Sequence, residues 1–156
     1  LPPVLKVAQR LRLPVFVQVG AGSRASTGAV LAAARAFPKI RWVLRGGTVR
    51  EHFQATVDLL RRVPSDSELQ LYVDTVGCAP DHIVPLIRGV GVERVLFATD
   101  AGLEADAARL AGLELMHAIE HAVPGDAARK IMGGNAQELL ANLRSFATRR
   151  SEPAAT

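Results

Sequence analysis

The chain has 156 residues, 49% of them hydrophobic, which is enough for one domain with a buried core. Its 19 Lys and Arg residues exceed its 15 Asp and Glu residues, but aromatic residues make up only 4%, which argues against nucleic-acid binding by base stacking. No apolar run reaches the roughly 18 residues of a membrane span. The single cysteine, Cys78, excludes an internal disulfide and favours a reducing, cytoplasmic compartment.

Apolar segments rich in β-branched residues recur along the chain at similar spacing, and a helix-like stretch follows each of them. We expect strands over residues 14–19, 40–44, 69–73 and 94–98. Strands that alternate with helices favour a parallel sheet built from right-handed βαβ units. The strand segments are apolar on both faces, as expected where helices cover a sheet.

The helix-like segments carry their own local signals. We expect helices over residues 2–11, 26–37, 48–64, 81–88 and 105–122. Thr48 and Glu51 form a capping box, which predicts that the third helix begins at Thr48. Pro85 is unfavourable inside a helix and predicts a late start or a kink. Asp126 and Asn135 are each predicted to cap a further helix.

Two motifs near the C-terminal end resemble a known family. Residues 94–100 read RVLFATD, an apolar strand that ends in the carboxylate of Asp100, and residues 133–140 read GGNAQELL. Together they resemble the last strand and the terminal helix of the amidohydrolase-related family, in its amidohydrolase-2 branch. The resemblance implies an α/β fold that is the C-terminal half, strands five to eight, of a TIM-type (β/α)8 barrel.

A complete barrel of this type needs roughly 250 residues, so the chain is too short to close one. We expect a half barrel over residues 1–146 and a disordered tail over residues 147–156. A four-stranded half leaves open sheet edges that can pair with another chain. We therefore expect a protein partner or a second copy of the chain to complete the barrel.

The resemblance also implies where a site would lie. In the family, the carboxylate at the position of Asp100 completes a metal site or acts as a base on water, and histidines end the fifth and sixth strands. Here Gln18 stands at the first histidine position, and Gly46 stands at the second, or Arg45 if the register shifts by one. A catalytic zinc site needs about three nitrogen, oxygen or sulfur ligands, so we expect no metal held by protein donors alone.

The candidate site therefore consists of Asp100 as a catalytic base, with Gln18, Arg24 and Arg45 as substrate-binding residues. Our first interpretation is a degenerate amidohydrolase-related domain that serves binding or assembly. The alternative is a metal-independent hydrolase or decarboxylase of small carboxylic acids or lactones that uses Asp100. A plainer interpretation of Asp100 is that it caps the following loop by accepting backbone amides.

A second alternative rests on residues 20–25, which read GAGSRA, follow a strand and open a helix. This pattern fits the G-x-G-x-x-A fingerprint of dinucleotide-binding domains, in which backbone amides approach a pyrophosphate.

Two weaker patterns favour plain structural roles. His117 to His121 reads HAIEH, an inverted zincin signature, but we expect it on the polar face of an outer helix. Cys78 precedes His82 by four residues, and without a third orienting group we interpret it as a small apolar residue.

Overall fold

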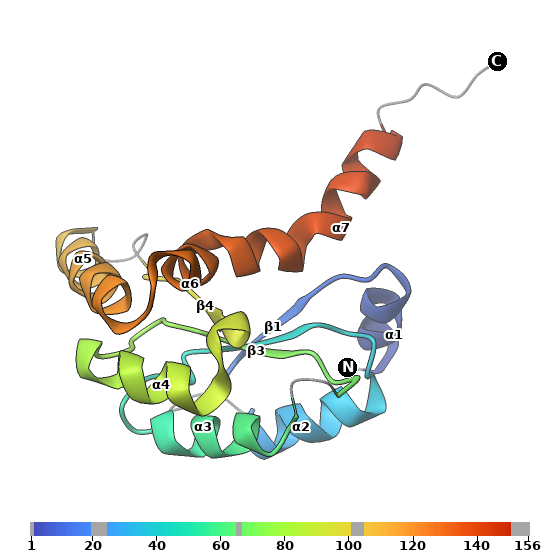
Figure 1. The fold of residues 1–156 in the computed structure, drawn as a ribbon. Coiled ribbons are helices and arrows are strands. Elements are labelled where there is room, and N and C mark those ends of the chain that lie inside the picture. The colour runs from blue at the N-terminus through green and yellow to red at the C-terminus, as the bar shows by residue number, and fades with distance from the viewer. Residues whose placement is uncertain (1, 20–24, 65–66, 101–104, 151–156) are drawn as a thin grey trace.

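The computed structural model of the protein describes residues 2–19, 25–64, 67–100 and 105–150 (Figure 1). At its centre is a four-stranded parallel sheet in the order β1-β2-β3-β4. The strands are β1 (Val15–Gln18), β2 (Trp42–Arg45), β3 (Leu71–Asp74) and β4 (Val95–Leu96). The predicted strands are thus confirmed within one or two residues, except that β4 is shorter than expected.

Each strand pairs with the next one along the chain, so the strand order never reverses. A dinucleotide-binding sheet holds its ligand in the crevice at the point where the strand order reverses. The described sheet has no such point, which argues against the dinucleotide-binding alternative. Of the glycine-rich segment on which that alternative rests, residues 20–24 lie outside the described residues.

Helices alternate with these strands and then follow them. They are α1 (Pro2–Arg10), α2 (Thr27–Ala36), α3 (Phe53–Arg61), α4 (Ile83–Val90), α5 (Ala105–Ala122), α6 (Gly125–Arg129) and α7 (Asn135–Arg150). Short turns connect some of them: the 3₁₀ turns η1 (Pro80–His82) and η2 (Val92–Arg94) and the π-helical turn η3 (Lys130–Gly134).

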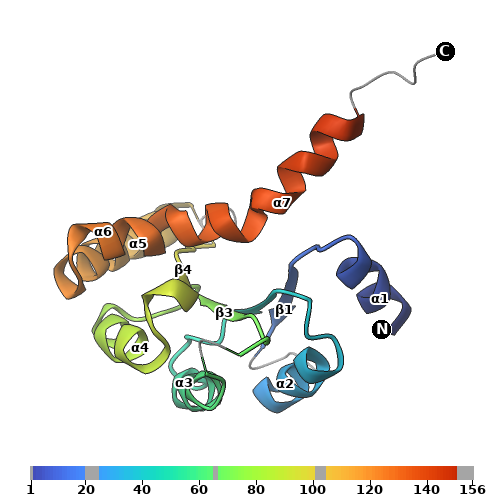
Figure 2. The ribbon, with the colours of Figure 1, turned by 45° about the vertical axis from the view of Figure 1, so that its right-hand side comes forward.

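The sheet has two different faces. Helices α2, α3 and α4 lie along one face, which we call the outer face, and α7 passes over the other, the inner face (Figures 1 and 2). The outer-face side chains, among them Leu44 and Val73, are fully buried in the main core. Helix α5 packs against α4 and adds Leu115 and Ile119 to the same core.

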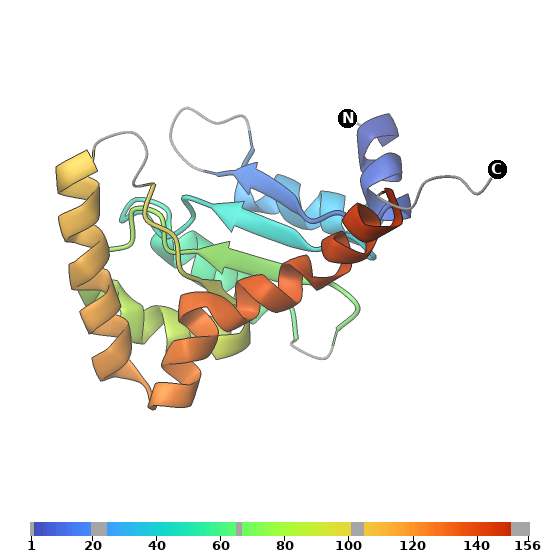
Figure 3. The same cartoon turned by 90° about the horizontal axis from the view of Figure 1, so that it is seen from above.

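The inner face is covered only in part. The cross-strand row formed by Phe16, Val43 and Tyr72 lies on this face, because alternate residues of a strand point to opposite sides. Leu139 of α7 packs on Val43 and Leu96, and both are buried. Figure 3 shows α7 crossing the sheet obliquely. Phe16, at the edge of the sheet, remains 54% exposed.

Two predicted helix starts are wrong. Helix α3 begins at Phe53 and not at Thr48, because the buried Thr48 hydroxyl is engaged by backbone carbonyls outside the helix. Asp126 lies in the first turn of α6, whose N-cap is Pro124. The late start at Pro85 is confirmed, since Pro85 is the third residue of α4, where no intrahelical donor is needed.

Asn135 does begin a helix, α7, but its side chain reaches the neighbouring strand instead of capping that helix. Helix α7 continues through Arg150, so residues 147–150, which the sequence pattern placed in the tail, are helical. Residues 151–156 lie outside the described residues.

Candidate functional site

The carboxyl ends of the four parallel strands meet at one edge of the sheet. Gln18 and Arg45 end β1 and β2 and are partners in the strand register. Asp74 ends β3, directly after the register pair of Leu44 and Val73, and Asp100 follows β4. We call these four residues, Gln18, Arg45, Asp74 and Asp100, the mouth. The strand ends therefore bring together three of the four residues predicted for the site, while Arg24 lies outside the described residues.

The exposed part of the mouth is an ion pair. Nη2 of Arg45 donates a hydrogen bond to Oδ1 of Asp100, and the two side chains are 41% and 38% exposed. The backbone of Asp100 has a φ of +55°, a left-handed conformation that Asp adopts more readily than most residues other than glycine. Asp100 is thus held by a cation in a left-handed turn and does not stand free at the strand end.

The buried part of the mouth is Asp74, which is 4% exposed. Its Oδ1 accepts the backbone N–H of Gly46 at 3.1 Å and that of Val76 at 3.3 Å. Burial raises the pKa of Asp74, although these two hydrogen bonds and the charge of Arg45 act in the opposite direction. Arg45 therefore faces two carboxyl groups, one buried and one exposed.

Two buried threonines fix the backbone beneath these carboxyl groups. The Thr48 hydroxyl lies 3.0 Å from the carbonyl oxygen of Asp74 and 3.1 Å from that of Val76. The Thr75 hydroxyl donates to the carbonyl of Ala98 and accepts its N–H, both at 2.9 Å. The strand ends that carry Asp74 and lead to Asp100 are thereby tied to the segments beside them.

Gly46 has a backbone conformation that disfavours a side chain. Its φ is +69°, a left-handed value that residues with a Cβ atom rarely adopt. A histidine at this position would therefore strain the backbone. The register pair with Gln18 is Arg45, so of the two residues that the sequence left open at the second histidine position, Arg45 is the one in the mouth.

Within the described residues, the mouth offers a divalent metal only its two carboxyl groups. Oδ1 of Asp74 accepts two amides, Oδ1 of Asp100 accepts a guanidinium, and Gln18 carries a neutral amide, which is a poor ligand. Among the described residues, no three His, Cys, Asp or Glu side chains gather in a group that would hold a metal ion.

The remaining sequence patterns contribute no side chain to the mouth. His117 and His121 are exposed on α5, where Nδ1 of His121 lies 2.7 Å from the carbonyl oxygen of His117. Burial raises the pKa of the Cys78 thiol to about 12, so it is a poor source of thiolate. The His82 ring lies on Phe53, with 4.2 Å between the centroids, which fits a packing role.

Asp74 is the mouth residue that sequence reasoning missed. The available signal was its place at the end of the third expected strand, one residue beyond the apolar run. A carboxylate in that place predicts a position in the mouth, because the carboxyl ends of parallel strands meet at one edge.

Comparison with known proteins assigns the family. The family model described as Amidohydrolase matches residues 2–141. The chain belongs to this family. The comparison with curated proteins gives no match.

Solved structures with the same fold include several TIM-barrel proteins. An uncharacterised TIM-barrel protein from Bordetella bronchiseptica is 19% identical, with a TM-score of 0.66, and the match covers 90% of this chain and 50% of that chain. For 4-oxalomesaconate hydratase from Rhodopseudomonas palustris the identity is 19% and the TM-score 0.65, over 96% of this chain and 52% of that one. A dihydroxybenzoic acid decarboxylase from Polaromonas, with bound manganese and an inhibitor, is 14% identical, with a TM-score of 0.62, over 89% and 53%.

The amidohydrolase chain thus spans about half the length of the solved structures it matches, and its fold is that of a partial TIM-type barrel. No helix in the described part of the chain is long and apolar enough to cross a membrane.

Proposed function

We propose that this chain is a degenerate amidohydrolase domain, half of a barrel, whose mouth serves assembly and binding and does not carry metal-dependent hydrolysis. The observation that carries the proposal is the ion pair between Arg45 and Asp100. A guanidinium occupies the register position beside Gln18 and engages the carboxylate that the family resemblance assigns to metal or water.

The chemistry of this pair supports a structural role. A carboxylate that accepts a hydrogen bond from a guanidinium is stabilised in its charged form and gives up basicity. The charge of Arg45 also offsets part of the rise that burial causes in the pKa of Asp74, so one guanidinium acts on two carboxyl groups. The positive charge that a metal ion would bring to such carboxylates is supplied here by a side chain.

The proposal includes a completing partner, either a second copy of this chain or a separate half barrel. The solved structures are about twice as long, and β1 pairs with β2 on one side only among the described strands. A cytoplasmic location is part of the same proposal and rests on the lone, half-buried Cys78.

Two measurements test this function together: elemental analysis of the protein purified without chelator, and turnover of small aromatic carboxylic acids and lactones. We expect less than a tenth of an equivalent of zinc or manganese and no turnover above background. About one metal ion per chain that is lost in Asp100→Ala would contradict the degenerate site.

A metal-independent hydrolase or decarboxylase of small carboxylic acids is the second candidate, and one observation favours it. The mouth holds two carboxyl groups in different environments, Asp74 buried with a raised pKa and Asp100 exposed. Such a difference is typical of an acid and base pair. This candidate predicts that the wild type turns over such an acid and that Asp100→Asn abolishes the turnover without changing the melting temperature. This result would establish the second candidate and refute the first.

A further inference from the structure

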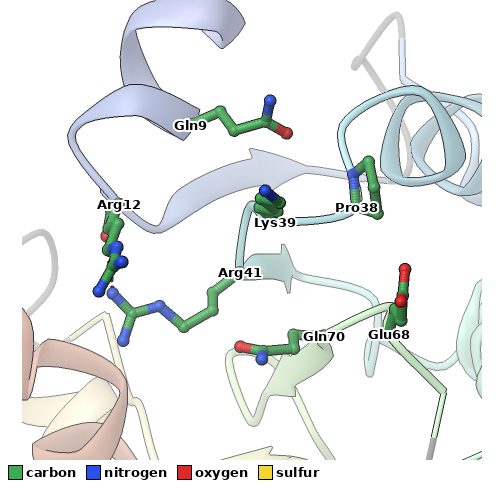
Figure 4. A pocket seen from close by; sticks show the side chains of 7 residues that line it. All are labelled: Gln9, Arg12, Pro38, Lys39, Arg41, Glu68 and Gln70. Atoms are coloured by element: carbon green, nitrogen blue, oxygen red, sulfur yellow. Dashed lines mark hydrogen bonds between the residues drawn. The ribbon is translucent and has the colours of Figure 1, made fainter.

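A second polar site lies at the opposite end of the sheet from the mouth. There a cavity of about 530 Å³ opens between the amino ends of β1, β2 and β3 (Figure 4). Its polar lining comes from the end of α1 and from the segments that enter the strands. These lining residues are Gln9, Arg12, Lys39, Arg41, Glu68 and Gln70.

The lining carries an excess of positive charge. Arg12, Lys39 and Arg41 face a single carboxylate, that of Glu68, and none of the three forms an ion pair within the described residues. Nη2 of Arg41 donates to the carbonyl of Arg12 at 2.7 Å, which holds the Arg41 guanidinium beside the Arg12 backbone. In Figure 4 the two guanidinium ends point toward one another. Like charges in such an arrangement repel, and an anion between them removes the repulsion.

The backbone of Arg12 supplies an independent observation. Arg12 has a φ of +53° and follows the end of α1, where its N–H bonds the carbonyl of Gln9 and the N–H of Leu13 bonds that of Ala8. This pattern of hydrogen bonds ends many helices, and the residue in the left-handed position is usually glycine. An arginine in this position lowers the free energy of unfolding relative to glycine. Backbone strain of this kind is concentrated at ligand-binding positions.

The remaining polar residues of the lining indicate which hydrogen-bonding groups the ligand carries. Gln9 lines the cavity, and its side-chain amide can donate a hydrogen bond to a hydroxyl group or accept one from it. Glu68 can accept from a second donor, and the Gln70 amide can donate to or accept from a hydroxyl.

We propose that this cavity binds a small organic phosphate that carries hydroxyl groups, such as a sugar phosphate. Arg12, Lys39 and Arg41 bind the phosphate oxygens through charge-assisted hydrogen bonds, of which the arginines can form two at a time. The hydroxyl groups form hydrogen bonds with the side-chain amide of Gln9 and donate to Glu68. The site is independent of the mouth, because it lies at the amino ends of the strands.

Calorimetric titration of the protein at low ionic strength tests the proposal with three probes: glucose 6-phosphate, inorganic phosphate and glucose. We expect glucose 6-phosphate to bind more tightly than inorganic phosphate, and glucose to bind not at all. Arg41→Ala and Arg12→Gly should each weaken glucose 6-phosphate binding about tenfold, as expected when one charge-assisted hydrogen bond is lost.

Arg12→Gly separates binding from folding. Glycine suits the left-handed position, so the variant should melt a few degrees higher than the wild type while it binds less well. Arg88→Ala is the matched control, because it removes an exposed arginine of α4 outside the cavity and should leave affinity unchanged. Asp100→Asn should also retain full affinity.

Several outcomes would overturn the proposal. They are the absence of heat with glucose 6-phosphate at millimolar concentration, an affinity that Arg12→Gly and Arg41→Ala leave unchanged, and equal affinity for inorganic phosphate, which would remove the role of the hydroxyl groups.

Discussion

The two carboxyl groups of the mouth show how position along a strand decides a residue's chemistry. Asp74 is the last residue of β3 and is covered by the loop that follows β2, whereas Asp100 lies beyond the end of β4 and reaches solvent. Burial raises the pKa of Asp74, whereas the exposed Asp100 carboxylate accepts a hydrogen bond from the Arg45 guanidinium. The same residue type thus occupies two different environments within one mouth.

The raised pKa of Asp74 predicts a dependence of stability on pH. In the unfolded chain this carboxyl ionises around its ordinary pKa of 3.8, whereas the folded protein keeps the proton to higher pH. The unfolded state therefore gains an advantage as the pH rises from 3.8 to the folded pKa. Asp74→Asn removes this penalty and retains an oxygen that accepts the Gly46 amide. Relative to the wild type, the variant should gain unfolding free energy between about pH 4 and about pH 7.

Urea denaturation of both proteins at the two pH values measures this gain, with Asp81→Asn as the control. Asp81 is 67% exposed, so Asp81→Asn removes a surface carboxyl group outside the mouth. An Asp74→Asn variant that loses stability on going to neutral pH would mean that the buried carboxylate is net stabilising.

Substitution of Thr48 is the second change for which an effect on stability is predicted. Thr48 is fully buried, and its hydroxyl serves the carbonyls of Asp74 and Val76. Thr48→Val keeps the shape but leaves these carbonyls without their donor, which should cost about 1–3 kcal/mol of unfolding free energy. Thr48→Ser retains the hydroxyl and should recover more than half of the loss. Equal stabilities of the valine and serine variants would show that shape alone matters.

These residues also show which features of the site could be predicted from the sequence and which could not. The motif around Asp100 could be recognised, and so could the replacements at Gln18 and Arg45, because a motif is a local pattern. The capping box at Thr48 was an equally good local pattern, yet it failed because acceptors from a distant strand engaged the hydroxyl. The pairing of Arg45 with Asp100 depends on two strand ends 55 residues apart, which a local pattern cannot show.

At the level of elements, Asn135 attaches the last helix to the last strand. It is 2% exposed, and its Nδ2 donates to the carbonyls of Val92 and Val95, both at 2.8 Å. These carbonyls lie at the entrance to β4, a strand of only two residues that has few ladder bonds of its own. Asn135→Ala removes both hydrogen bonds and should destabilise the protein by about 2–3 kcal/mol.

Thermal unfolding checks this prediction, and Gln137→Ala is the control because Gln137 is exposed on the same helix. If α7 is attached through Asn135, hydrogen exchange in the Asn135→Ala variant should quicken first in α7 and β4. An unchanged melting temperature would show that Leu139 packing alone holds the helix.

Element order was predictable from sequence, and element ends were less so. The alternation of apolar and amphipathic segments gave all four strands, and the helix over residues 105–122 was predicted to the residue. Ends depend on tertiary contacts: β4 stops at Leu96 because the next residues bond elsewhere, the Phe97 amide to Ile131 and the Ala98 amide to Thr75. The helical course of residues 147–150 was missed because their polar composition is typical of a tail.

For the molecule as a whole, the incomplete inner face predicts association. Phe16 is 54% exposed, and β1 has a strand partner on one side only among the described strands. Burial of a Phe side chain is worth about 1.5–3 kcal/mol, and an open strand edge can pair with another chain. Light scattering at micromolar concentration should therefore give a mass above that of the 16.6 kDa monomer.

A substitution on each face distinguishes association through the inner face from non-specific association of exposed apolar residues. Phe16→Ser should shift the mass toward the monomer and leave the melting temperature of the fold nearly unchanged. Val84→Ser, which changes a 38% exposed apolar residue on α4, should leave the mass as it was. A wild-type monomer that unfolds cooperatively would refute the need for a partner.

The contact of Leu139 with Val43 has a consequence for the order of events during synthesis. Each strand pairs with its neighbour along the chain, so the sheet can grow one unit at a time as the polypeptide emerges. Leu139 follows all four strands in the chain, so it covers Val43 and Leu96 only after the whole sheet has been made. Until α7 has been synthesised these side chains lack this cover, which makes the interval between the completion of the sheet and the docking of α7 a period of aggregation risk.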